Sequence, residues 1–119
     1  MNVDYIIRGG RVIDPSTGVD EIKDLYIRGM HVVDAAGETP SCDPDRIIDA
    51  SGKIVTPGLI DFHTHLFWEG SSICIHPDMM IAQGTTSAVD AGSAGTSNYE
   101  AFYKSVVAQS QLRLKGFLT

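Results

Sequence analysis

The sequence is poor in cysteine and in long apolar runs, and each shortage excludes a class of protein. Of the 119 residues only Cys42 and Cys74 are cysteines, and they form no Cys-x-x-Cys motif. Two reduced thiols in the cytoplasm are the simplest interpretation, with a disulfide between them left open. No apolar stretch approaches the roughly 20 residues of a membrane span. The first residues also lack the basic region and apolar core of a secretory signal.

Basic residues are also scarce. Lysine and arginine number 9 against 15 aspartates and glutamates, which gives a formal net charge of −6. Nucleic acids and anionic membranes bind basic surfaces, so neither is expected as a partner. With 43% hydrophobic and 20% charged residues, the composition is that of an ordinary globular protein with a real core.

The first 54 residues alternate short apolar segments with turn signals, a pattern typical of a small sheet or sandwich. Gly9 and Gly10 predict a turn, and Gly29 and Met30 predict a hairpin. Further turn signals lie at residues 15–18 and 50–52, and a polar loop at 38–45. The expected strands cover residues 4–8, 11–14, 25–28, 31–34 and 46–49.

After Lys53 the pattern becomes strand, helix, strand, helix, strand, which is the rhythm of a parallel sheet. Strands are expected at 59–63, 85–90 and 113–118, and a short helix at 78–83 ends at Gly84. Ser97 and Glu100 form a capping-box pattern for a second helix. The apolar face of that helix would be Tyr99, Phe102, Tyr103, Val106 and Val107.

Residues 57–65 read Pro-Gly-Leu-Ile-Asp-Phe-His-Thr-His and follow an apolar run, which predicts a buried strand. On a strand Asp61, His63 and His65 share one face, with alternate Cα atoms about 6.6 Å apart. Two imidazoles at that spacing can converge on one metal ion. An acid and two histidines on an apolar strand cost desolvation energy unless something pairs with them, and a divalent cation would do so.

Each polar residue also has an ordinary structural interpretation. A lone histidine on a strand usually belongs to the core or the surface, and Asp61 is as well explained as a hydrogen-bonding carboxylate. Asp90 could shape a substrate pocket or cap the loop that follows it. His76 precedes Pro77 at an expected helix start, so a surface or capping role is favoured. Cys74 lies in an apolar run and is expected to be a buried thiol.

Three segments, residues 4–15, 48–65 and 83–92, together resemble the amidohydrolase superfamily of metal-dependent hydrolases. The most specific is residues 48–65, Ile-Asp-Ala-Ser-Gly-Lys-Ile-Val-Thr-Pro-Gly-Leu-Ile-Asp-Phe-His-Thr-His. Residues 90–95, Asp-Ala-Gly-Ser-Ala-Gly, are most similar to the dihydroorotase-like amidohydrolase/deacetylase group. The resemblance covers almost the whole chain in order.

The resemblance implies an α/β fold with a β-sandwich. Residues 1–54 would be the N-terminal part of a composite β-sandwich. Residues 55–119 would be the start of a catalytic (β/α)8 (TIM) barrel, reaching about strand three and truncated there. His63 and His65 would then lie at the carboxyl end of the first barrel strand, where active sites of such barrels are found.

The resemblance also implies a mechanism. Family enzymes hold one or two divalent ions, often zinc, and a metal-activated hydroxide attacks a carbonyl, cleaving a C–N bond or less often an ester. His63 and His65 would be metal ligands, with Asp61 and Asp90 as candidates for orienting a histidine or lining the substrate pocket. The substrate would be a small molecule such as a cyclic amide, ureido compound or N-acyl amino acid, and a homo-oligomer is compatible with the sequence.

The family site needs further groups that the sequence does not supply. A carboxylated lysine or glutamate from strand four, histidines from strands five and six and an aspartate from strand eight have no counterpart here. A complete barrel takes about 250 residues. We therefore expect the chain to be the first third of such a protein and to have no useful catalytic rate alone. The alternatives are a non-catalytic fragment or interaction module, and a small metal-binding protein that adds Cys74 or His76 to the histidine pair.

Overall fold

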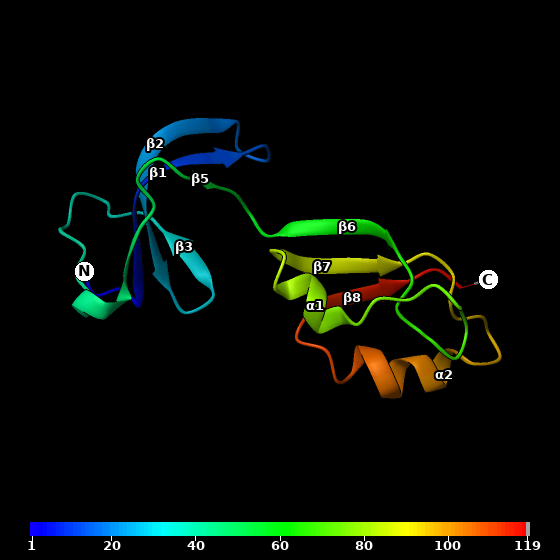
Figure 1. Ribbon diagram of the computed structural model, residues 1–119. Helices are drawn as coiled ribbons and strands as arrows, with labels where there is room; N and C mark the ends of the chain where they lie inside the picture. Colours follow the sequence, from blue (N-terminus) through cyan, green and yellow to red (C-terminus); the bar gives the residue numbers. More distant parts are fainter. Residues whose placement is uncertain (119) are drawn as a thin grey trace. The chain divides into compact units, whose positions relative to one another are not determined.

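The chain forms two compact units, Met1–Pro57 and a second that begins at Gly58, in a computed structural model that describes residues 1–118 (Figure 1). The division falls at Pro57, slightly after the expected boundary at residue 54. The fold is mixed α/β and consists mostly of strands. No helix in residues 1–118 combines the length and apolar character needed to cross a membrane.

The first unit is a five-stranded sheet with the order β3-β2-β1-β4, in which β5 also pairs with β1. The strand β2 pairs antiparallel with both β1 and β3, whereas β4 and β5 run parallel to β1. Val3, Ile6, Val12 and Ala50 are its buried apolar side chains. Its elements are β1 (Tyr5–Asp14), β2 (Val19–Arg28), β3 (His31–Val33), the 3-10 turn η1 (Pro44–Arg46), β4 (Ile47–Asp49) and β5 (Ile54–Val55).

The turn predicted at Gly9 and Gly10 is wrong, because β1 continues through both residues as a bulged strand. The register against β2 shifts between Ile7 and Gly10, and Gly9 adopts a φ of +69°, which favours glycine. Gly10 packs so closely that a Cβ there would lie 2.5 Å from Cγ2 of Val55. A glycine pair suits a bulge as well as a turn, so composition alone did not separate the two.

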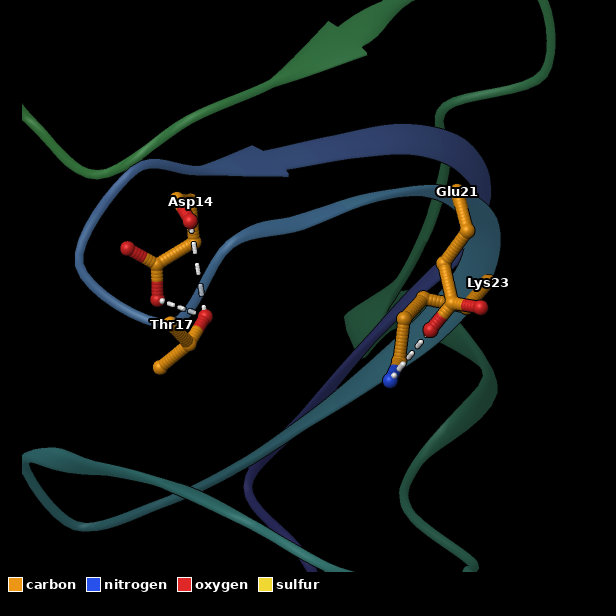
Figure 2. A network of polar contacts seen from close by, with 4 residues as sticks. All are labelled: Asp14, Thr17, Glu21 and Lys23. Atoms are coloured by element: carbon orange, nitrogen blue, oxygen red, sulfur yellow. Dashed lines mark hydrogen bonds and ion pairs between the residues drawn. The ribbon is translucent and has the colours of Figure 1, made fainter.

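The other predicted turns of this unit are present. Gly29 connects β2 to β3 in the expected hairpin. After β1, the Asp14 carboxylate accepts hydrogen bonds from the Ser16 hydroxyl at 2.7 Å and from Thr17 Oγ1 at 2.9 Å. These bonds, chiefly the one from Ser16, lower the pKa of Asp14 below its ordinary value. Figure 2 shows the Asp14–Thr17 contact beside the Glu21–Lys23 ion pair of β2.

The second unit is a parallel three-stranded sheet with the order β6-β7-β8. Its helices supply core side chains to one face of this sheet, and Met80, Ala88, Phe102, Val106 and Leu114 meet there. Figure 1 shows α1 and α2 lying on that face. The elements are β6 (Leu59–Thr64), α1 (Pro77–Ile81), β7 (Thr85–Asp90), α2 (Tyr99–Phe102), the π-helical turn η2 (Tyr103–Val107) and β8 (Arg113–Gly116).

The strand β6 is present as expected, but it is not buried. Leu59, Ile60 and Phe62 are all more than half exposed. The strand lies at one edge of the sheet, and within residues 1–118 only β7 pairs with it. Burial begins where the strand ends, because Leu66 and Phe67 enter the core under the helices. An apolar run indicates a strand, but it does not show which neighbours cover that strand.

The capping box predicted for the second helix is also wrong. The helix begins after Asn98, whose Oδ1 accepts the Gly95 N–H at 2.8 Å, and Glu100 pairs instead with Lys104. Phe102 and Val106 are buried as predicted, whereas Tyr103 is half exposed. Tyr103 is the first residue of the π-turn Tyr103–Val107, in which Val106 stays buried.

Candidate metal-ligand site

The histidine pair lies where β6 ends. His63 belongs to the last part of the strand and is exposed, whereas His65 follows the strand and is half-buried. Their ring centroids are 5.7 Å apart, with the ring planes at 80°. The two imidazoles are therefore neighbours at the carboxyl end of a parallel strand, where ligands of α/β folds characteristically bind.

His65 is held by contacts on both its backbone and its ring. Its carbonyl oxygen accepts the Ile75 N–H at 3.0 Å. Its Nδ1 lies 3.2 Å from the Ser93 hydroxyl, in the loop after β7. A hydrogen bond at one ring nitrogen leaves the other, Nε2, to face a ligand, as in most metal-bound histidines.

Asp90, the last residue of β7, is fully buried and organises this end of the sheet. Its Oδ2 accepts the Leu66 N–H at 2.7 Å, and its Oδ1 accepts the N–H groups of Gly92 at 3.0 Å and Ser93 at 2.6 Å. One carboxylate thus joins the loop after β6 to the loop after β7. The sequence left two roles open for Asp90, shaping a substrate pocket or capping the loop that follows it. These hydrogen bonds match the loop-capping role.

The ends of β6 and β7 are joined in two further ways. The Thr64 hydroxyl donates to the carbonyl oxygen of Val89 at 2.9 Å, and the Ala91 N–H donates to the carbonyl oxygen of Thr64 at 2.7 Å. Thr64 and Val89 are buried and Ala91 is half-buried, so solvent competes little with these bonds. The backbone that carries the histidine pair is therefore fixed relative to the loop that carries Ser93.

Asp61 lies on β6 beside the pair, and its carboxylate bonds to backbone. Its Oδ1 accepts the N–H of His63 at 3.1 Å, and the side chain is exposed. The structure therefore places Asp61 next to His63, with its carboxylate hydrogen-bonded to the main chain of that residue.

The other candidate ligands lie apart from the pair or have different partners. Nδ1 of His76 accepts the Asp78 N–H at the start of α1, and the ring stacks on Trp68, so its predicted capping role is confirmed. Cys74 is exposed, contrary to the expected buried thiol, because its loop lies at the surface. Residues 1–118 contain no cluster of three or more histidine, cysteine, aspartate or glutamate side chains that could enclose an ion. The described part of the chain thus brings together two candidate ligands, which disfavours a self-sufficient small metal site.

Reasoning from sequence missed the Ser93 hydroxyl. Residues 90–95 carry the family resemblance, but that resemblance assigns no role to Ser93. The available signal was the Asp-x-x-Ser spacing at the end of a strand, since a short acidic side chain readily bonds the N–H groups two and three residues later. Contact with His65, 28 residues earlier in the chain, follows from the parallel pairing of β6 and β7 and has no local sequence signal.

Paired histidines lie at the carboxyl end of β6, the first strand of a parallel sheet in a mixed α/β fold. The sequence model of the amidohydrolase family matches residues 46–114. The chain belongs to the amidohydrolase family.

Individual relatives agree with this assignment. A deacetylase of Agrobacterium fabrum is 37% identical over 97 residues, which are 80% of this chain and 24% of that protein. A dihydroorotase of Geobacter metallireducens is 47% identical over 64 residues, 54% of this chain and 15% of that protein. The chain therefore spans a quarter or less of the length of these curated relatives.

Solved structures show the same fold. A dihydroorotase crystal structure matches 96% of this chain and 29% of that chain, with a TM-score of 0.71 and 27% identity. An adenine deaminase crystal structure matches 98% of this chain and 30% of that chain, with a TM-score of 0.72 and 26% identity.

Proposed function

We propose that these residues belong to a metal-dependent hydrolase of carbon–nitrogen bonds and that His63 and His65 are two of its metal ligands. The observation that carries the proposal is the pair of neighbouring imidazoles at the carboxyl end of β6, one of them tied to Ser93 through Nδ1. The residues fit a divalent ion, because imidazole nitrogen is a preferred ligand of zinc and the bond to Ser93 supplies the outer contact that such ligands usually make.

The proposed hydrolysis would combine a metal ion with the side chains that bind it and keep it in position. A zinc ion held by His63 and His65 would lower the pKa of a bound water to about 7 and polarise a substrate carbonyl. His63 and His65 would bind that ion as neutral imidazoles, and Ser93 and Asp90 would keep His65 and its loop in place. Asp61 is next to His63 and would tune the position of its backbone. A small molecule with a cyclic amide or N-acyl bond is the proposed substrate, with an ester as a further class.

The wider architecture is part of the same proposal. The sheet of residues 1–54 would be the N-terminal part of a composite β-sandwich, and residues 55–119 the first strands of a (β/α)8 barrel. Support comes from the parallel order β6-β7-β8, from the helices on one of its faces, and from the likeness to the dihydroorotase crystal structure. A cytoplasmic location is proposed on the two unpaired cysteines.

Metal analysis tests the proposal most directly. The complete coding sequence that contains these residues is expressed, and the zinc bound per chain is measured by elemental analysis. We expect stoichiometric zinc in the wild-type protein and less zinc per chain in His63→Asn and in His65→Asn, since each removes a ligand. His31→Asn, in the other unit, is the matched control. Equal metal content in all four proteins would refute the proposal.

The substrate class is tested with the same protein. A cyclic amide such as dihydroorotate is compared with N-acetyl amino acids, because the relatives are named as dihydroorotase and deacetylase. We expect hydrolysis of one class, abolished by a chelator and restored by zinc. The 119-residue chain alone is expected to bind zinc weakly and to hydrolyse neither. Hydrolysis that resists the chelator would contradict metal dependence.

A further inference from the structure

We infer that Ser93 is a positioning residue for His65. The imidazole donates its Nδ1 proton to the Ser93 hydroxyl, 3.2 Å away, and thereby presents the Nε2 lone pair to a metal ion. A neutral imidazole carries one proton, so donation from Nδ1 leaves the Nε2 lone pair free, whereas acceptance at Nδ1 would place the proton on Nε2. The inference rests on the proposed function, since it assigns His65 as a ligand.

The first support is that Ser93 is immobilised. Its side chain and backbone are only 4% exposed, and its N–H donates to the buried Asp90 carboxylate at 2.6 Å. Gly92 donates to the same carboxylate oxygen, so two successive N–H groups of the loop are held. Because the backbone of Ser93 is held in place, its hydroxyl oxygen is also held in place. A hydrogen-bond partner in a fixed position can orient the His65 imidazole.

The second support is the close packing of the two loops. A Cβ on Gly70 would lie 1.7 Å from the carbonyl oxygen of Ser93. The loop after β6 therefore touches the backbone of Ser93 directly, with no space for a side chain between them. Gly70 thus allows the approach that brings His65 and Ser93 within hydrogen-bonding distance.

The third support is that, within residues 1–118, the Ser93 hydroxyl has no second hydrogen-bond partner. Among the hydrogen bonds of residues 1–118, its only contact is with His65, whereas the Asp90 bonds go to backbone N–H groups. Ser93→Ala therefore removes the contact with the ring and leaves the carboxylate network in place. This separation makes the inference testable apart from the stability of the loop.

The first test is an NMR measurement of the His65 tautomer in the metal-free, full-length protein, using long-range nitrogen–proton correlations. We expect the Nδ1–H form in the wild-type protein and a shift toward the Nε2–H form, which free histidine favours in water, in Ser93→Ala. Ser105→Ala, which removes an exposed hydroxyl bonded to the Ala101 carbonyl, is the control and should change nothing. The Nε2–H form in the wild-type protein would overturn the inference, and this measurement needs no variant to fold.

The second test is zinc affinity by competition with a chromogenic chelator. Loss of an outer contact of a metal-bound histidine typically costs 10–100-fold in affinity, so we expect a rise of about tenfold or more in the zinc Kd of Ser93→Ala. An unchanged Kd in a folded Ser93→Ala protein overturns the inference alone. A wild-type protein that binds no zinc overturns the proposed function, and the inference with it.

Discussion

The Asp90 carboxylate accepts the backbone N–H of Leu66 at 2.7 Å, joining two residues that lie 24 positions apart in the sequence. Leu66 directly follows the histidine pair, and Asp90 directly precedes the loop that carries Ser93. The carboxylate therefore fixes the separation of the two segments from which the candidate site is built. Its three N–H partners satisfy a charge that would otherwise be costly to bury.

Replacing Asp90 by asparagine should destabilise the second unit. The amide keeps the shape of the carboxylate but loses its charge and turns an NH2 group toward at least one N–H donor. A hydrogen bond to a charged group contributes about 1.5–3 kcal/mol, so we expect a loss of that order in the free energy of unfolding. Urea unfolding of the full-length protein checks it, with Asp78→Asn, at an exposed carboxylate of α1, as the control. Equal midpoints for the two variants would show that the Asp90 network contributes little.

Gly70→Ala, in the loop after β6, should disturb the contact of that loop with Ser93. The added Cβ would overlap the Ser93 carbonyl, which is backbone and cannot rotate away. Overpacking of this kind costs about 1–3 kcal/mol, and the accompanying shift should also weaken zinc binding. Thermal unfolding and chelator competition measure the two effects. Ser72→Ala, an exposed alanine substitution in the same loop, should leave both unchanged, and a neutral Gly70→Ala would contradict the close approach.

His76→Ala should weaken α1 without affecting the metal. The ring nitrogen accepts the Asp78 N–H at the helix start, and loss of an N-cap costs about 0.5–2 kcal/mol. His76→Asn restores a capping oxygen and should recover most of the stability. Zinc content should equal the wild-type value in both variants. A loss of metal in His76→Ala would instead make this residue a ligand.

The Asp14 turn should contribute to stability in a pH-dependent way. Because hydrogen bonds from Ser16 and Thr17 lower the pKa of Asp14 from an ordinary value of 3.8, the folded state holds the proton less tightly than the unfolded chain. The contribution is present above pH 3.8 and is lost as the pH falls through the lower folded pKa. A carboxyl-carbon NMR titration should give a midpoint below 3.8 in the wild-type protein. In Ser16→Ala/Thr17→Val the midpoint should return toward 3.8, and an unchanged midpoint would exclude these hydroxyls as the cause.

Local patterns predicted most of the second unit. The strand at residues 85–90 has the expected bounds, because β-branched and small apolar residues lie between Gly84 and Gly92. The neighbouring positions of His63 and His65 follow from the two-residue period of a strand, which is also a local property. The short helix before Gly84 was likewise expected within one or two residues of its ends.

What the sequence could not predict depends on partners far along the chain. The contact between His65 and Ser93 and the bond from Leu66 to Asp90 both cross from β6 to β7, so no short window of residues contains them. The exposure of Phe62 depends on which strands cover β6. At Gly9 the bulge depends on the fit against β2, which composition alone does not describe.

The contact between His65 and Ser93 also has a consequence for the order of folding. Ser93, which contacts the His65 ring, is synthesised 28 residues after His65. Ser93 can therefore orient the ring only after β7 has paired with β6 and the loop after β7 has formed. A nascent chain that ends before Ser93 would carry both histidines without the arrangement that favours an ion. If the histidine pair binds zinc in the full-length protein, tight capture would need β6–β7 pairing to be complete, and the ion would join a segment that is already folded.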